Sequence, residues 1–186
     1  MELIGLYFVA CVLLIAAGLA KALHPGDTAR ALAGLVPISP RLRAVAVRIG
    51  SVAEALLGTI ALVAPRSATA WLVAASYLGF AAVVILLRSR GGAIASCGCF
   101  GTPDTPATVV HAVIDVVLGV SAVWVAVDGP GGSLASLLSA QPLDGVPLVA
   151  ASALCAWLTF LAISTLSQVE AARRALGISR RPGERR

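Results

Sequence analysis

Apolar runs of about twenty residues alternate with short polar stretches along this chain. The runs lie at residues 3–23, 44–64, 68–87, 107–127 and 146–167. A helix rises 1.5 Å per residue, so about 20 apolar residues cross the hydrocarbon core of a bilayer. The pattern therefore predicts an all-α, polytopic membrane protein with five transmembrane helices.

The composition agrees with this prediction. Hydrophobic residues make up 59% of the 186 residues and charged residues only 12%, whereas a soluble domain carries about 25% charged residues. Such a chain lacks the polar side chains needed to cover its surface in water, so we expect a lipid bilayer around it. The first run is interpreted as a retained helix, because its start, "MELIG", has Glu2 and no Lys or Arg, unlike a signal peptide.

The connections between the runs differ in character. Residues 24–43 are polar, basic and contain prolines, and residues 64–67 ("APRS") form a tight turn. Residues 128–145 hold two Asp and no basic residue, and their stretch "SLASLLSA" is compatible with a short interfacial helix. Residues 168–186 form a basic tail. The predicted organisation is a helical membrane domain over 1–127, an extracytoplasmic loop over 128–145, a fifth span and this tail.

Basic residues are distributed unequally between the two sets of connections. One set holds twelve of them, namely Lys21, Arg30, Arg41, Arg43, Arg88, Arg90, Arg173, Arg174, Arg180, Arg181, Arg185 and Arg186. The opposite set holds Arg66 as its one basic residue, together with Glu2, Asp128 and Asp144. Because cytoplasmic loops are enriched in Lys and Arg, we predict an outer N-terminus and a cytoplasmic C-terminus in a bacterial plasma (inner) membrane. A basic tail after an apolar helix is typical of contact with anionic lipid, and nucleic-acid binding is not expected.

Four ionisable residues fall inside predicted spans. Arg48 and Glu54 lie in the run 44–64, and His111 and Asp115 lie four residues apart, on one face of the run 107–127. Ionisable groups in a span are costly and usually face the interior of the bundle. One interpretation is a functional cluster in which Arg48 keeps a carboxylate ionised and His111 exchanges protons. The other is that these residues only join helices together; Lys21, near a helix end, is expected to reach the interface.

Residues 95–106, "ASCGCFGTPDTP", lie between two apolar runs and place Cys97 and Cys99 one glycine apart. A disulfide across so short a ring is strained, although Gly98 gives the backbone freedom. Strained disulfides are easily reduced and tend to be catalytic or regulatory. Phe100 is a candidate to cover the two sulfur atoms, and Gly101 is a candidate to turn the chain toward the next run. A metal or copper site and an inert loop remain alternatives; a closed zinc site needs four ligands, so no metal is predicted.

Cys11 and Cys155 form a possible second redox pair. Both lie at similar depths from the predicted outer ends of their spans. Cysteine is also a common small buried residue without chemistry, so the pairing is one of two interpretations.

Three sequence elements together resemble the MauE branch of the DoxX-like membrane proteins. They are "AAGLAKAL" at the end of 3–23, "SVAEALLGTIALV" with Glu54, and "SCGCFG" before 107–127. The resemblance covers residues 3–127, and it implies a four-helix bundle to which this chain adds a fifth transmembrane helix. By motif position it also implies that Cys97 and Cys99 are the redox residues, with Lys21 and Glu54 as polar positions typical of the family.

The resemblance further implies a thiol–disulfide role, because MauE is associated with maturation of a disulfide-rich periplasmic protein alongside a thioredoxin-like partner. The chain departs from the expected pattern where His111 and Asp115 stand, since an Arg was expected near the start of that run. Periplasmic maturation fits an outward loop, whereas the charge pattern places Cys97 and Cys99 at the cytoplasmic face. An inward dithiol is compatible with electrons from a cytoplasmic thioredoxin.

The leading functional hypothesis is therefore a membrane thiol–disulfide oxidoreductase that needs no bound cofactor. A quinone-linked membrane subunit, with quinone as a possible cofactor and partner, is the first alternative. A non-enzymatic membrane assembly factor is the second.

Overall fold

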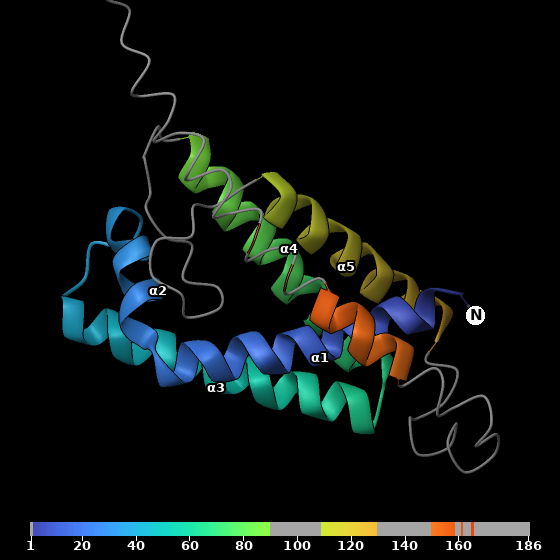
Figure 1. Cartoon of the computed structure of the whole chain (residues 1–186). Coiled ribbons are helices and arrows are strands. Elements are labelled where there is room, and N and C mark those ends of the chain that lie inside the picture. The colour runs from blue at the N-terminus through green and yellow to red at the C-terminus, as the bar shows by residue number, and fades with distance from the viewer. Residues whose placement is uncertain (1, 90–108, 130–149, 159–160, 162–164, 166–186) are drawn as a thin grey trace, which may run out of the picture.

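The computed structural model describes residues 2–89, 109–129, 150–158, 161 and 165 (Figure 1). Within these residues the regular structure is helical, without a strand. The elements are α1 (Glu2–Leu23), α2 (Pro25–Ala31), the 3-10 helix η1 (Leu32–Gly34), α3 (Pro40–Val63), α4 (Ser67–Ser89) and α5 (Val109–Asp128). Residues 150–158 form a further helical segment.

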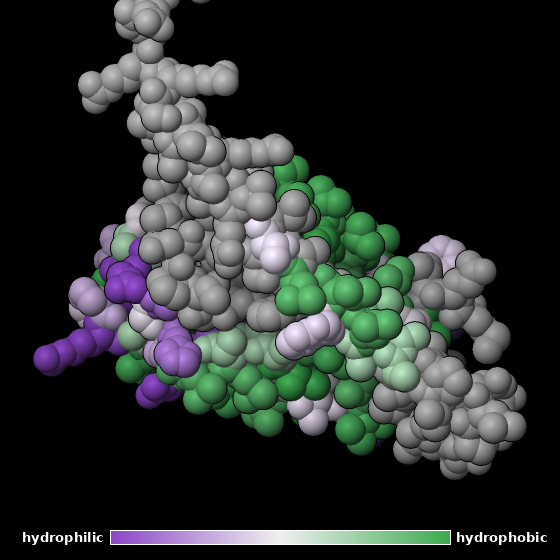
Figure 2. Space-filling view, in the orientation of Figure 1, coloured by the Kyte–Doolittle hydropathy of each residue, from purple (hydrophilic) through white to green (hydrophobic). Residues whose placement is uncertain are grey.

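Four of these helices are long and apolar enough to cross a membrane, namely Ile4–Leu23, Pro40–Val63, Ser67–Leu86 and Val109–Asp128. Their outward faces carry large apolar side chains such as Ile49, Leu56 and Trp124, each more than half exposed. Figure 2 shows hydrophobic residues over the sides of the helices and hydrophilic residues gathered at the α2 end. Lipid, unlike water, accommodates such faces at no cost. The chain is a multi-pass α-helical membrane protein, as predicted.

The four spans expected in the first 127 residues each coincide with one of these helices. α3 begins earlier than the expected residue 44, because Pro40 takes the first helical position and Ser39 caps the helix, its Oγ accepting from the Leu42 amide at 3.4 Å. The polar connection 24–43 is also more ordered than expected, since it contains α2 and η1, and Arg30 pairs with Asp27 on α2.

Parts of the prediction fall outside the described residues. The expected fifth span, 146–167, is described only at 150–158, 161 and 165, all of them helical. The "SLASLLSA" stretch and the tail 168–186 lie outside, and the orientation across the membrane stays a prediction.

The helices form two antiparallel pairs, α1 with α3 and α4 with α5, and contacts within each pair are the most extensive in the bundle (Figure 1). α1 also contacts α5, and α3 contacts α4. Glycines allow α1 and α3 to approach closely. A Cβ at Gly18 would lie 2.7 Å from the Ser51 carbonyl oxygen, and one at Gly58 would lie 2.8 Å from the Cys11 carbonyl oxygen. Small residues at such crossings are typical of membrane helices.

The bundle is densely packed around the first half of α1. Its buried residues come from α1, α3, α4, α5 and the segment 150–158, and include Tyr7, Phe8, Cys11, Leu14, Ala61, Val73, Ala122, Val125 and Ala156. The Tyr77 hydroxyl donates a hydrogen bond to the Ala10 carbonyl oxygen at 2.7 Å and joins α4 to α1. This apolar core fixes the helices whose other ends carry the polar residues.

Candidate functional site

A partly buried ion pair joins α1 to α3 at the end of the bundle where α1 terminates. Lys21 is 6% exposed, and its Nζ forms a salt bridge with Glu54 Oε2. The same Nζ lies 4.4 Å from the centre of the Phe80 ring on α4, in cation–π range. The close crossing at Gly18 brings the two helices near enough for the pair to form. The expectation that Lys21 reaches the interface is therefore wrong, because Glu54 and Phe80 hold it inside.

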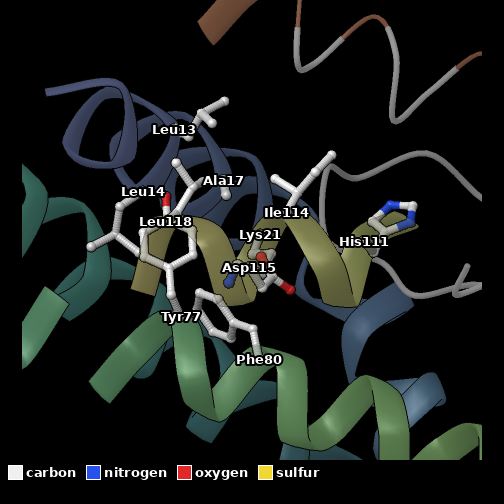
Figure 3. Close-up of a pocket in the computed structure, with 10 residues that line it drawn as sticks. All are labelled: Leu13, Leu14, Ala17, Lys21, Tyr77, Phe80, His111, Ile114, Asp115 and Leu118. Carbon is white, nitrogen blue, oxygen red and sulfur yellow. The ribbon is translucent and has the colours of Figure 1, made fainter. Parts of the chain in front are cut away.

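Asp115 on α5 faces the same ammonium group. Figure 3 shows Lys21 and Asp115 beside each other, with Tyr77 and Phe80 approaching from α4. Both line a small cavity of about 40 Å³ between α1, α4 and α5. Lys21 is thus placed between the carboxyl group of Glu54 on α3 and the carboxyl group of Asp115 on α5.

His111 lies one turn before Asp115 on α5 and is 5% exposed. It lines the same small cavity as Asp115 and Lys21, to one side of the Lys21–Asp115 pair in Figure 3. The expectation that His111 and Asp115 share one face of their helix, directed into the bundle, is confirmed.

A second cavity, of about 320 Å³, lies on the other side of Lys21, between α1, α2, η1, α3 and α4. Its walls are mostly apolar, and its polar lining residues are Lys21, Thr28, Arg43, Ser51 and Glu54. The Arg43 guanidinium donates to the Ala29 carbonyl oxygen at 3.1 Å and to the Ile38 carbonyl oxygen at 2.7 Å. Its Nε is buried and has no hydrogen-bond partner among the described residues. A cavity of this size and character is typical of small-molecule sites.

Arg48 is not part of the carboxylate cluster. Its side chain is exposed, and its Nε donates to the Ala22 carbonyl oxygen at 3.1 Å, near the end of α1. The hypothesis that Arg48 keeps a carboxylate ionised is wrong for Glu54, because Lys21 occupies that position. Arg48 lies six residues before Glu54 on α3, so it is more than one turn nearer the first residue of this helix, Pro40.

The cysteines divide into described and undescribed ones. Cys97 and Cys99, with Gly98, Phe100 and Gly101, lie outside the described residues, so their redox role stays a prediction. Cys11 is buried in the apolar core, whereas Cys155 is exposed on the segment 150–158. Their proposed pairing is likewise untested.

The helix ends on either side of the connection that contains Cys97 and Cys99 are described. This connection joins Ser89, the last residue of α4, to Val109, the first residue of α5. Lys21 lies two residues before the end of α1, and His111 lies two residues after the start of α5. The buried charges therefore lie at the end of the bundle to which both termini of this connection belong.

Sequence reasoning missed the aromatic wall formed by Tyr77 and Phe80 and the division of the site into two cavities. An apolar span gives no signal for which of its aromatic residues will face a charge. The signal for Lys21 was present, since it is the one Lys beside thirteen Arg and lies within an apolar run.

The family model described as "Methylamine utilisation protein MauE" matches residues 2–128. The matched region contains all four described membrane-spanning helices and ends where α5 ends. Neither a curated protein nor a solved structure matches the chain.

Proposed function

Because the chain belongs to the MauE family, we propose that it is a membrane thiol–disulfide oxidoreductase that uses Cys97 and Cys99 and supports redox maturation of extracytoplasmic proteins. The family description also connects it with methylamine utilisation, and we propose that the matured proteins serve that process. The observation that carries the proposal is the position of the buried cluster. Lys21, Glu54, His111 and Asp115 lie at the bundle end where the Cys97–Cys99 connection leaves α4 and enters α5.

The proposed reaction is thiol–disulfide exchange with a thioredoxin-like partner. In the oxidising direction, a partner thiolate attacks one sulfur of the Cys97–Cys99 disulfide, and the other sulfur leaves as a thiolate. A second partner thiolate then attacks the mixed disulfide. The partner leaves with a disulfide, and Cys97 and Cys99 remain as a dithiol that has gained two electrons and two protons. The reverse sequence reduces the partner.

Titratable groups near the cysteine connection serve this chemistry. Only the thiolate is a nucleophile, so each exchange step requires a proton to leave a sulfur or return to one. Histidine is the side chain whose ordinary pKa lies near neutral pH, and the carboxyl groups of Asp115 and Glu54 lie at the same end of the bundle as His111. Lys21 holds Glu54 in place. We assign His111, Asp115 and Glu54 to proton handling, and the thiol chemistry to Cys97 and Cys99.

The test is trapping of the mixed disulfide in cells. In Cys97→Ser or Cys99→Ser, the remaining thiol can form the mixed disulfide but cannot resolve it. We expect one of these variants to accumulate a reductant-sensitive adduct with a thioredoxin-fold protein on non-reducing gels. The double variant and the matched control Ser96→Ala should accumulate none. If neither single variant traps a partner and both retain activity, the proposal is wrong.

The 320 Å³ cavity favours a second candidate function, a quinone-linked subunit. Its apolar walls fit a quinone ring, and the Lys21–Glu54 pair and Arg43 supply polar groups. The balanced step is a dithiol plus a quinone giving a disulfide plus a quinol, with transfer of two electrons and two protons. Quinone-dependent reoxidation of the reduced chain, slowed by Val84→Trp in the cavity wall, supports this function. Reoxidation at equal rates with and without quinone opposes it.

A non-enzymatic assembly factor predicts a different outcome of the trapping experiment. The buried charges would then only hold helices together, and the partner complex would not depend on thiols. Complexes that stay intact in the double Cys97→Ser, Cys99→Ser variant support this alternative.

A further inference from the structure

The larger cavity extends along α3 and has polar groups at two levels. Arg43 lies near the start of α3, and Glu54 lies eleven residues later, which is about 16 Å along the helix axis. The walls between these levels are mostly apolar and include Val47 of α3 and Val84 of α4. The cavity is partly open to the surroundings of the bundle. A molecule that enters it therefore meets a cation near the end of the bundle and mainly hydrocarbon beyond.

Arg43 has hydrogen-bond donors to spare. A guanidinium group carries five N–H donors, and two of them bond to the carbonyl oxygens of Ala29 and Ile38. The Nε–H group is buried and has no partner among the described residues. Neither ion pair in the described part of the chain includes Arg43. Because a buried donor without a partner is costly, the site favours an acceptor that comes from outside the chain.

Further basic side chains lie at the same end of the bundle. Arg41 and Arg48 are exposed on α3, and Arg30 on α2 pairs with Asp27. Figure 2 shows hydrophilic residues gathered at the α2 end and hydrophobic residues over the sides of the helices. Such a border is where membrane helices meet lipid headgroups, and basic pockets between membrane helices bind acidic headgroups.

We propose that this cavity binds an anionic acyl lipid, with the acid group on Arg43 and an acyl chain between α3 and α4. The acid oxygens accept charge-assisted hydrogen bonds from the guanidinium group, and the apolar walls accept hydrocarbon in place of water. At the inner end Lys21 is paired with Glu54, so Arg43 is the cation of this cavity that remains for the acid group. Nothing in this proposal depends on the chemistry of Cys97 and Cys99.

The shared ligand chemistry, an oxyanion on an acyl chain, has two sources, an acidic phospholipid of the bilayer and a free fatty acid. The test is native mass spectrometry of the full chain in an uncharged detergent. The anionic probes are dipalmitoyl phosphatidylglycerol and palmitate, and their counterparts without net charge are dipalmitoyl phosphatidylcholine and hexadecanol. We expect one anionic probe per chain, retained roughly tenfold more tightly than its counterpart. The anionic probe that is retained more tightly identifies the source.

Four variants locate the site. Arg43→Gln should weaken retention of the anionic probe roughly tenfold, whereas Arg41→Gln, the same change at an exposed position two residues earlier, should leave it unchanged. Gly50→Leu should also weaken retention, because Gly50 lines the cavity and a Cβ there meets nothing within 4 Å. Gly79→Leu is its matched control, since Gly79 is exposed on α4, has equally open surroundings and does not line the cavity.

Three results overturn the proposal: no probe is retained, the anionic probes bind no more tightly than their counterparts, or Arg43→Gln retains them as well as the unsubstituted chain does. An added quinone that is retained more tightly than either anionic probe also overturns it and assigns the cavity to the quinone-linked function. If Arg43→Gln does not fold, Gly50→Leu against Gly79→Leu decides. Retention should persist in the Cys97→Ser, Cys99→Ser chain even if the redox function is wrong.

Discussion

The two halves of the helix bundle differ in what fills their interior: one is packed with apolar side chains, and the other contains charged side chains and cavities. Around the first half of α1 the buried residues are mostly apolar, and the Tyr77 hydroxyl donates a hydrogen bond to a backbone carbonyl oxygen of α1. Around Lys21 the same helices place the side chains of Arg43, Glu54, His111 and Asp115 around two cavities. One half is filled and the other is partly hollow.

The difference indicates where stability and function reside. Dense packing of apolar and small residues is what associates helices in lipid, so the first half of α1 supplies most of the cohesion. Buried charge and empty volume both lower the free energy of unfolding. The Lys21 end of the bundle therefore makes the protein less stable than an apolar, filled end would. Intramembrane ionisable residues are functional candidates for this reason.

The largest expected effect comes from breaking the charge balance. Lys21→Met leaves Glu54 without its partner, and loss of one member of a buried pair destabilises a protein by roughly 3–5 kcal/mol. Replacing both members, as in Lys21→Met with Glu54→Gln, should recover part of this loss, because residue 54 then carries no charge that lacks a partner, while the Asp115 carboxyl group is still present. Denaturant unfolding in mixed micelles, followed by circular dichroism, measures both variants.

Equal destabilisation by the single and double variants would contradict this account of the Lys21 end. Glu54→Gln alone is the informative third variant. It should be milder than Lys21→Met, because Asp115 remains as a partner for the ammonium group.

A smaller effect is expected at Tyr77, whose ring lines the small cavity and whose hydroxyl bonds to the apolar half of α1. Tyr77→Phe removes the hydrogen bond to the Ala10 carbonyl oxygen and should cost roughly 1 kcal/mol. The same unfolding assay detects the change. Trapping of a partner by Cys97→Ser or Cys99→Ser should be unaffected in this background, and a loss of trapping would mean that the two halves are not separable.

The sequence predicts the helices well, because a bilayer imposes one length and one polarity on every span. All four spans of the first 127 residues are confirmed by long apolar helices. The helix ends are less predictable. α3, for example, begins at Pro40 with Ser39 as its cap, within residues that the sequence pattern predicts to be a polar connection. α2 and η1 escaped prediction for a related reason, since short helices carry little periodic signal.

The site is less predictable than the fold, because rotation of each helix about its axis decides which charges meet. His111 and Asp115 are four residues apart, so their common face follows from helix geometry alone. The pairing of Glu54 with Lys21 rather than Arg48 depends on the crossing of α1 and α3 at Gly18. The positions of Phe80 and Arg43 depend on helix packing in the same way.

The central claim is that Cys97 and Cys99 alternate between a dithiol and a disulfide. The direct measurement is differential alkylation of the purified chain in nanodiscs, equilibrated over a series of thiol redox buffers and read by mass spectrometry of the peptide that contains both residues. The account predicts that both cysteines are alkylated at reducing poise, that neither is alkylated at oxidising poise, and that the transition is reversible and unchanged in Ser96→Ala. Two cysteines that stay fully alkylated at every poise would contradict it.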